Sequence, residues 1–244
     1  MKIHKTIDKD LLKEMPKVLF AGEIHIASTP EEAERAVTFL KSFPLLGIDT
    51  ETRPSFTKGH SHKVALLQVS ADEHCFLFRL NQTGLTLPII QLLESTRVTK
   101  VGLSLKDDFH ALHNRAPFEP RAYIELQQLV REFGIEEMSL QKIYGILFGE
   151  RISKTQRLSN WEAEHLTIPQ QQYAATDAWA CLNIFHRLMA LRQSGDYEVV
   201  DDRPPAEEEA HPSPAMAHTE KATAESQAAP KEEERTTKHA EIHV

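Results

Sequence analysis

The stretch LLGIDTE at residues 45–51 joins an apolar segment with β-strand character to two carboxylates one residue apart. Successive side chains of a strand alternate between its faces, so Asp49 and Glu51 point the same way. Two like charges side by side cost free energy unless a divalent cation or a shared proton lies between them. The same residues also fit a strand that runs out into a solvated turn, with Arg53 and Pro54 following. Because Asp-x-Glu is a short pattern, this stretch alone leaves both interpretations open.

The segments around this stretch predict an α/β architecture, a mixed β-sheet flanked by helices. Strands that come early, with helices interleaved afterwards, are typical of such a sheet. The residues between the third and fourth of these strands are few enough for a hairpin. The predicted strands are 18–26, 45–50, 64–70, 75–80 and 98–103, and the predicted helices are 87–94, 106–113, 124–133, 140–148 and 170–192.

The last predicted helix carries an acidic residue on its apolar face. Thr167 and Gln170 fit a capping box at its start. A carboxylate on a core-facing stripe is costly unless it is paired or bound to a metal. Asp177 therefore either belongs to a functional site or bonds a buried backbone group or an arginine. Tyr173 lies one turn before Asp177 on the stripe, which continues through Cys181, Ile184, Leu188 and Leu191.

A third acidic position, GLSLKDDF at 102–109, lies where a strand ends and a helix begins. Acidic residues in a first helical turn are favoured by the helix macrodipole, so either aspartate fits a simple capping role. Two adjacent side chains cannot both face inward. We therefore expect one of Asp107 and Asp108 to face the end of the sheet and the other to cap the helix or face solvent.

Four carboxylates from these three positions would form a cluster with oxygen ligands only. Such a set suits Mg²⁺ or Mn²⁺ better than Zn²⁺, which prefers histidine and cysteine. Two such ions about 3.5–4 Å apart form the clamp that cleaves phosphodiesters in two-metal enzymes. The sequence therefore predicts a two-ion centre of Mg²⁺ or Mn²⁺.

The three motifs resemble those of the DEDD superfamily of 3′–5′ exonucleases, in the subclass with a tyrosine in the third motif. The motifs are DTE at 49–51, GLSLKDD at 102–108 and YAATDA at 173–178. The likeness is greatest to exonuclease domains of the Werner syndrome helicase type, and it covers about residues 20–192. The histidine subclass would place His before Tyr173, where this chain has Gln172. The likeness extends to KVALLQV at 63–69 and RLSNW at 157–161.

This resemblance implies a ribonuclease-H-like fold and a set of site residues. It implies metal-dependent hydrolysis of the terminal phosphodiester at a nucleic-acid 3′ end, with release of nucleoside 5′-monophosphates. Tyr173 would orient the attacking water. The metal ligands would be Asp49, Glu51, Asp108 and Asp177.

The sequence identifies the residues that would contact the substrate less clearly than it identifies the acidic residues. Lys154 and Arg157 are candidate phosphate contacts, with Arg53 and Lys63 as further candidates, and all four also fit solvated surface charge. DNA is favoured over RNA, because ribonuclease D-like RNA-trimming exonucleases share the motifs but carry further helical domains after the catalytic one. A catalytically silent nucleic-acid-binding protein of the same fold is the other alternative.

Composition divides the chain near residue 195. Residues 196–244 contain 13 acidic and 5 basic residues, whereas residues 1–195 are balanced in charge. We predict an exonuclease domain at 1–195 and an acidic, disordered low-complexity tail at 196–244. A neutral domain can still present a basic face to nucleic acid.

The sequence also indicates where the protein is located and in which state its cysteines are. It has neither a run of about 18 apolar residues nor a signal-peptide core, so we expect a cytoplasmic protein without membrane contact. Cys75 and Cys181 are too few for a disulfide framework, and we expect both to be reduced and buried. The pairs His60 with His62 and His110 with His113 have metal-like spacing but no matching partners, so we interpret them as surface or core histidines.

Overall fold

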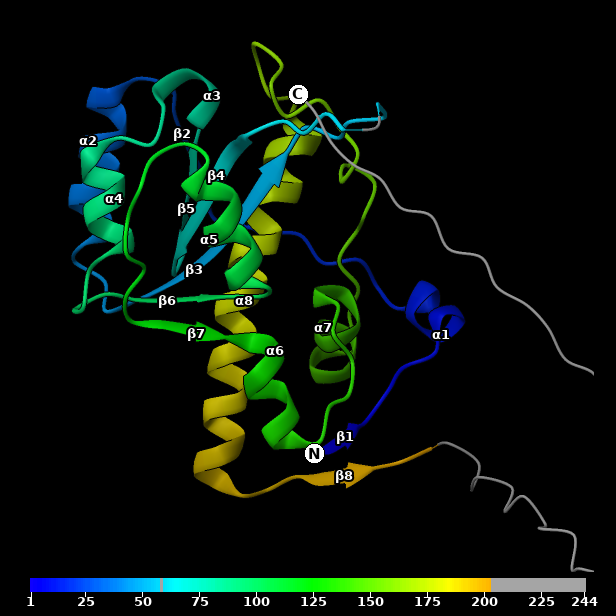
Figure 1. Cartoon of the computed structure of the whole chain (residues 1–244). Helices are drawn as coiled ribbons and strands as arrows, with labels where there is room; N and C mark the ends of the chain where they lie inside the picture. Colours follow the sequence, from blue (N-terminus) through cyan, green and yellow to red (C-terminus); the bar gives the residue numbers. More distant parts are fainter. Residues whose placement is uncertain (58, 203–244) are drawn as a thin grey trace, which may run out of the picture. The chain divides into compact units, whose positions relative to one another are not determined.

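The computed structural model describes residues 1–57 and 59–202, and its centre is a mixed sheet with the strand order β2-β5-β4-β3-β6-β7 (Figure 1). β3 and β5 both run antiparallel to β4, while the β2–β5, β3–β6 and β6–β7 pairs are parallel. The strands are β2 (Glu23–Ala27), β3 (Leu45–Thr52), β4 (Val64–Ala71), β5 (His74–Phe78), β6 (Thr99–Gly102) and β7 (Tyr123–Glu125).

Helices cover both faces of this sheet (Figure 1). On one face lie α2 (Pro30–Leu40), α4 (Leu87–Leu93) and α5 (Leu105–His113), and on the other lies α8 (Ile168–Ser194). Every residue of β4 is buried, since this strand lies between the two helical layers. The mixed sheet flanked by helices that the sequence predicts is confirmed. The remaining helices are α1 (Lys9–Glu14), α3 (Leu80–Thr83), α6 (Leu126–Leu129), α7 (Leu140–Phe148) and the 3₁₀ helix η1 (Val130–Phe133).

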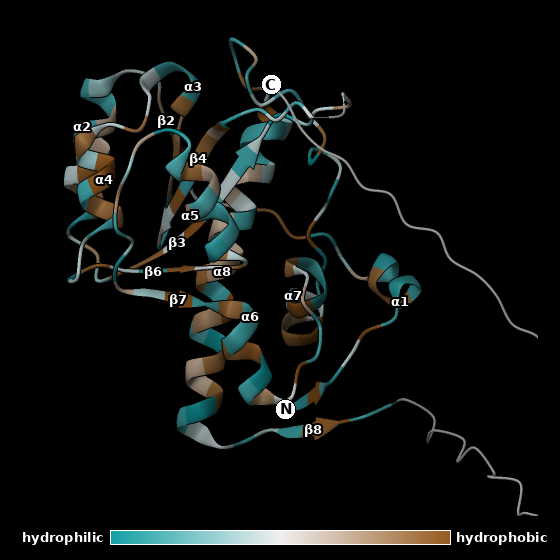
Figure 2. Ribbon diagram, viewed as in Figure 1, coloured by the Kyte–Doolittle hydropathy of each residue, from teal (hydrophilic) through white to brown (hydrophobic). Residues whose placement is uncertain are grey.

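Apolar burial holds these layers together. In Figure 2 much of β6, α4 and α7 is coloured as hydrophobic. α7 packs on α8 and extends the core beyond the sheet, where it shares a cluster with Ile184 and Leu188. Burying a side chain of this size contributes about 1.5–3 kcal/mol, so α8 is fixed along most of its length.

Gly47 allows α8 to lie against β3. A Cβ at this position would overlap the carbonyl oxygen of Ala178 and lie 3.1 Å from Cβ of Leu182. Only a hydrogen fits there without moving the helix. Because Asp49 follows Gly47 on the same face of β3 and Asp177 precedes Ala178 on α8, this close approach brings two acidic motifs together.

Several predicted elements have different bounds in the structure. The strand predicted at 18–26 starts only at Glu23, because the residues before it run outside the sheet, where Val18 bonds the backbone of Arg151. The helix predicted at 124–133 begins as β7, because residues 123–125 pair with β6, and the rest is α6 and η1. The helix α2 was not predicted, although Thr29 and Glu32 form a capping box at its start.

Other predictions agree with the structure. β4 and β5 form the expected hairpin, α7 has the predicted bounds, and Thr167 and Gln170 form the predicted capping box of α8. Cys75 and Cys181 are free and buried, as expected. Among the residues that the structure describes, no helix is long and apolar enough to cross a membrane.

The predicted start of the tail at residue 196 is wrong by several residues. A second, two-stranded sheet pairs β1 (Lys2–His4) in parallel with β8 (Glu198–Val200), and the terminal amine of Met1 bonds the Asp196 carbonyl at 2.9 Å. Composition did not reveal this strand, because its partner lies at the other end of the described chain. The rest of the predicted tail, 203–244, lies outside the described residues.

Candidate active site

Two carboxylates of β3 and one of α8 converge where α8 crosses the sheet. Asp49 and Glu51 point to the α8 side of β3, as their spacing predicts, and meet Asp177. One ligand oxygen from each of the three lies within 4.8 Å of the others. Glu51 and Asp177 are buried, with 8% and 6% of their surface exposed, and Asp49 is half-buried.

Asp108 approaches this cluster from α5. Thr50, between the two acids of β3, donates a hydrogen bond from its hydroxyl to the Asp108 carboxylate. Asp108 is half-buried, whereas its neighbour Asp107 is exposed. Asp108 lies within electrostatic reach of Asp49 and Glu51 but outside the group of oxygens within 4.8 Å, whereas Asp107 faces solvent.

Glu125 fixes the turn that leads into α5. Its two carboxylate oxygens accept hydrogen bonds from the backbone N–H groups of Ser104, at 2.9 Å, and Leu105, at 2.7 Å. Ser104 has a left-handed backbone, with φ of 63°, which these bonds hold in place. Sequence reasoning missed both Thr50 and Glu125. No local signal marked Glu125, because it lies in the helix predicted at 124–133 and its role depends on β7, which the sequence did not predict.

Burial and mutual repulsion make these carboxylates hard to ionise. Burial, followed by the charges of Asp177 and Asp108, raises the pKa of Glu51 to about 9. Burial also raises the pKa values of Asp108 and Asp177 to about 7 each, and that of Asp49 well above its usual range. The cluster therefore retains protons near neutral pH unless a cation compensates its charge.

The donor set fits hard divalent cations. All four side chains offer carboxylate oxygens, which Mg²⁺ and Mn²⁺ prefer. Opposite Asp49 in β4 lies Gln68, which is fully buried and whose side-chain amide has no hydrogen-bond partner among the described residues. A buried polar group without a partner is costly, and an amide beside the carboxylates is available to bond the water ligands of a bound ion.

Tyr173 lies on the same side of α8 and hydrogen-bonds Asp177 through its hydroxyl. Burial and the neighbouring acids raise the pKa of Tyr173 above its usual range, so it stays protonated. Its ring packs 5.9 Å from that of Trp161, which is fully buried, as expected for a packing residue. Tyr173 also lines a pocket of about 320 Å³ together with Ile152 and Gln172. None of the four carboxylates lines this pocket, and Tyr173 is the residue that it shares with the site.

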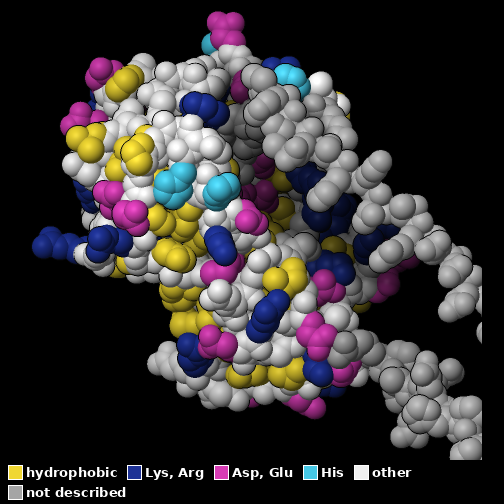
Figure 3. Space-filling model, viewed as in Figure 1, with side chains coloured by type: hydrophobic (Ala, Val, Ile, Leu, Met, Phe, Trp, Pro, Cys, Tyr) yellow, Lys and Arg dark blue, Asp and Glu magenta, His cyan; other side chains and the backbone are white. Residues whose placement is uncertain are grey.

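Basic side chains lie next to the acids. Lys154 and Arg157 are exposed in the segment between α7 and α8. The charge of Arg157 opposes the rise in the pKa of Glu51, and that of Lys154 opposes the rise at Asp177, so both lie within electrostatic reach of the cluster. In Figure 3, Lys and Arg side chains gather beside a hollow in which acidic side chains are visible.

Other candidates from the sequence have different surroundings. Arg53 pairs with Glu162 at 3.3 Å, and Lys63 is exposed just before β4. His62 also contacts Glu162, at 3.2 Å. His113 bonds two backbone carbonyls, those of Phe109 and Phe118, which is a structural role.

Comparison with known proteins places this site in context. The family described as 3′–5′ exonuclease matches residues 24–191. A 3′–5′ exonuclease of Arabidopsis thaliana is 28% identical over 195 residues, covering 73% of this chain and 68% of the relative. The mouse bifunctional 3′–5′ exonuclease/ATP-dependent helicase WRN is 29% identical over 150 residues, covering 59% of this chain but only 11% of that protein. The chain thus spans about two thirds of the first relative and a small part of the second.

Solved structures share the fold. The exonuclease domain of Nibbler from Aedes aegypti superimposes with a TM-score of 0.67 at 18% identity, covering 74% of this chain and 95% of that one. Ribonuclease D of Escherichia coli superimposes with a TM-score of 0.63 at 23% identity, covering 70% and 46%. These likenesses confirm the expected ribonuclease-H-like fold. The acidic cluster lies within residues 24–191, which match the 3′–5′ exonuclease family.

Proposed function

Because this chain belongs to the 3′–5′ exonuclease family, we propose that it removes nucleotides from nucleic-acid 3′ ends with the help of divalent cations. The observation that carries the proposal is the convergence of Asp49, Glu51 and Asp177, whose ligand oxygens lie within 4.8 Å of one another. Buried carboxylates so close together are costly without a cation, and this cost is a sign of function.

Four residues would hold two ions of Mg²⁺ or Mn²⁺: Asp49, Glu51, Asp108 and Asp177. The chemistry that such ions would supply there is a lower pKa for the attacking water and stabilisation of charge on the leaving 3′ oxygen. Thr50 holds the Asp108 carboxylate in position through its hydrogen bond. Glu125 supports the same residue by fixing the start of α5.

Tyr173 serves as the positioning group for water. Its hydroxyl proton is engaged with Asp177, so its oxygen lone pairs remain free to accept a hydrogen bond from the attacking water. Since burial keeps the phenol protonated, Tyr173 orients this water rather than removing its proton.

Lys154 and Arg157 supply charge for the substrate backbone. Contacts to phosphates fix the position of a strand without reading its sequence, which suits an enzyme that removes any terminal nucleotide. Lys9 of α1 and Lys142 of α7 also interact electrostatically with Lys154, and Lys142 is paired with Glu137 at 2.7 Å.

We infer DNA as the preferred substrate. The resemblance in the motifs is to Werner-type exonucleases, whereas ribonuclease D, at 23% identity, shares the fold. RNA trimming and nucleic-acid binding without catalysis are the alternative outcomes.

One assay tests the proposal. The protein is incubated with 3′-recessed DNA, single-stranded DNA and RNA of equal length, each with Mg²⁺, Mn²⁺ or EDTA. Metal-dependent shortening from the 3′ end, fastest on DNA, is expected, and it should be lost in Asp49→Asn but kept in Asp107→Asn, whose acid is exposed. Shortening of RNA alone overturns the DNA preference, and no shortening of any substrate overturns the exonuclease proposal.

A further inference from the structure

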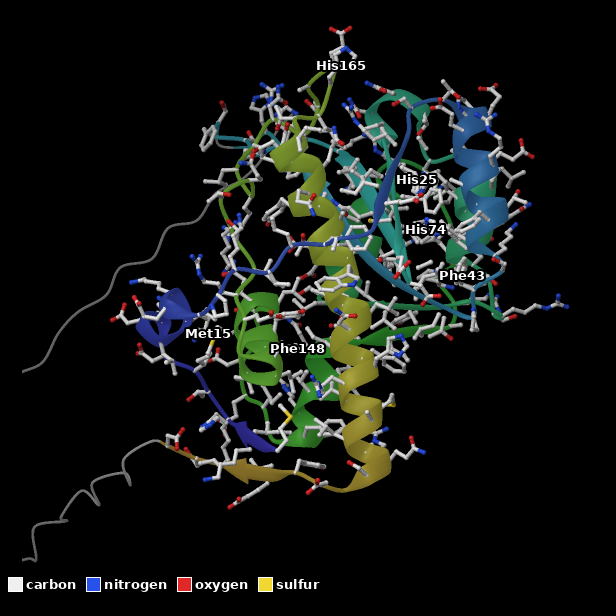
Figure 4. The ribbon with its side chains drawn as sticks, turned by 180° about the vertical axis from the view of Figure 1, so that it is seen from behind. Met15, His25, Phe43, His74, Phe148 and His165 are labelled. Atoms are coloured by element: carbon white, nitrogen blue, oxygen red, sulfur yellow. The ribbon has the colours of Figure 1, made fainter. Side chains whose placement is uncertain are left out.

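Two histidines and a glutamate meet at the edge of the sheet. Glu23 and His25 lie two residues apart on β2, so they point to the same face, and His74 of β5 is the register partner of Glu23. The atoms His25 Nε2 and His74 Nδ1 are 3.1 Å apart. Glu23 Oε2 lies 3.6 Å from the first and 3.7 Å from the second. Figure 4 shows His25 and His74 close together beside β2 and β5.

These three atoms have the spacing of ligands on one metal ion. Ligands about 2.0–2.2 Å from a tetrahedral ion are about 3.3–3.6 Å apart. The observed separations of 3.1, 3.6 and 3.7 Å bracket this value, so an ion fits among the three atoms with little rearrangement. The side chains of His25, His74 and Glu23 are 40%, 32% and 73% exposed, which leaves a path for the ion and for water ligands.

The surroundings hold both rings in place. The His25 ring stacks on Phe76 of β5, with ring centres 4.7 Å apart. The His74 ring meets the edge of Phe39 on α2 at 5.1 Å. Side chains that are already oriented lose little entropy on binding, so these aromatic contacts favour a metal site.

This cluster is separate from the acidic site. Phe76 belongs to the core on the α2 side of the sheet, and its neighbours Cys75 and Leu77 belong to the core on the α8 side. His74 therefore shares the α2 side with Phe76, whereas Asp49 faces α8. Imidazole ligands also select different ions from an all-carboxylate set.

We propose that Glu23, His25 and His74 bind one divalent transition ion of the Zn²⁺ class, with water completing its coordination. The ion would join β2, an edge strand of the sheet, to β5. Its effect is stabilisation of this edge, and it does not depend on the exonuclease proposal. Sequence reasoning missed the site because His25 and His74 are 49 residues apart.

The test measures Zn²⁺ binding by the full chain after all metal has been removed from it. Excess Mg²⁺ is then added so that the acidic site is filled before Zn²⁺ is titrated. Equilibrium dialysis gives the number of Zn²⁺ ions bound, and thermal unfolding gives the stabilisation. The variants are His25→Gln with His74→Gln, and Glu23→Gln alone. The matched control is His165→Gln with His186→Gln, two exposed histidines outside the cluster.

We expect one Zn²⁺ per chain and a higher Tm with Zn²⁺, in the unsubstituted protein, in the control and in Asp177→Asn. Mutating a residue that only hydrogen-bonds a metal ligand already weakens metal binding about 10–100-fold. The double variant, which lacks two ligands, should therefore lose at least that much Zn²⁺ affinity. Glu23→Gln should weaken binding to a smaller extent. Absence of Zn²⁺ binding in excess Mg²⁺, or equal binding by the double variant and the control, overturns the proposal and leaves only a hydrogen bond between His25 and His74.

Discussion

Replacing Asp177 by Asn should stabilise the metal-free protein while removing its activity. Asparagine has nearly the same shape and keeps an oxygen that accepts the Tyr173 hydrogen bond, but it carries no charge. Burial raises the pKa of Asp177 from its usual value of 3.8 to about 7. At 1.36 kcal/mol per unit, ionising this carboxylate in the folded state costs about 4 kcal/mol.

The stability difference between Asp177→Asn and the unsubstituted protein should depend on pH. Below about pH 4, Asp177 is protonated in both the folded and the unfolded chain, so the substitution should have little effect. As the pH rises toward 7, the unfolded chain releases this proton while the folded chain retains it, and the unsubstituted protein loses stability. Above pH 7 the advantage of Asp177→Asn should level off at up to about 4 kcal/mol.

Urea unfolding in EDTA over a series of pH values measures this difference. Asp107→Asn is the control, since this exposed neighbour should change stability by less than about 0.5 kcal/mol. Added Mg²⁺ or Mn²⁺ should stabilise the unsubstituted protein more than Asp177→Asn. The reasoning is refuted if Asp177→Asn is no more stable than the unsubstituted protein at about pH 8, or if its advantage does not grow with pH.

Three further predictions concern the supports of the site. Thr50→Val removes the donor to Asp108 and should lower activity roughly 10–100-fold with the fold intact, measured by steady-state kinetics and circular dichroism; unchanged activity would contradict this role. Lys154→Ala combined with Arg157→Ala should raise KM with little change in kcat. The slope of log affinity against log salt concentration should fall by about 2, one for each lost phosphate contact, and an unchanged slope would exclude both residues from substrate binding. Gly47→Ala should cost about 1–3 kcal/mol in urea unfolding and reduce activity, because the new methyl group pushes α8 away from β3; full stability would show that the helix can shift freely.

Local patterns were enough for the elements whose signals lie within one segment. The capping box at Thr167, the helix over 140–148 and the hairpin between β4 and β5 each depend on nearby residues, and each was predicted. The strands β7 and β8 were not predicted, because each has three residues and is formed only by pairing with β6 or β1. The helix α2 had a local signal at Thr29 and Glu32 that the sequence interpretation did not use.

For the acidic residues too, local sequence determined some features and tertiary contacts determined others. Alternation along residues 45–51 determines that Asp49 and Glu51 share a face, and helical periodicity determines that Asp177 follows Tyr173 on one side of α8. The choice between Asp107 and Asp108 depended on the motif resemblance, and the structure adds the reason, a hydrogen bond from Thr50.

By itself, the sequence determined the α/β class, the exonuclease motifs and the direction in which each acidic side chain leaves its own element, because these depend on residues close together in the chain. Only the tertiary structure decided which of these side chains meet. The close approach at Gly47, the turn held by Glu125, and the meeting of His25 with His74 join segments that are distant in sequence. Their energies come from packing and repulsion between those segments, and no local pattern contains them.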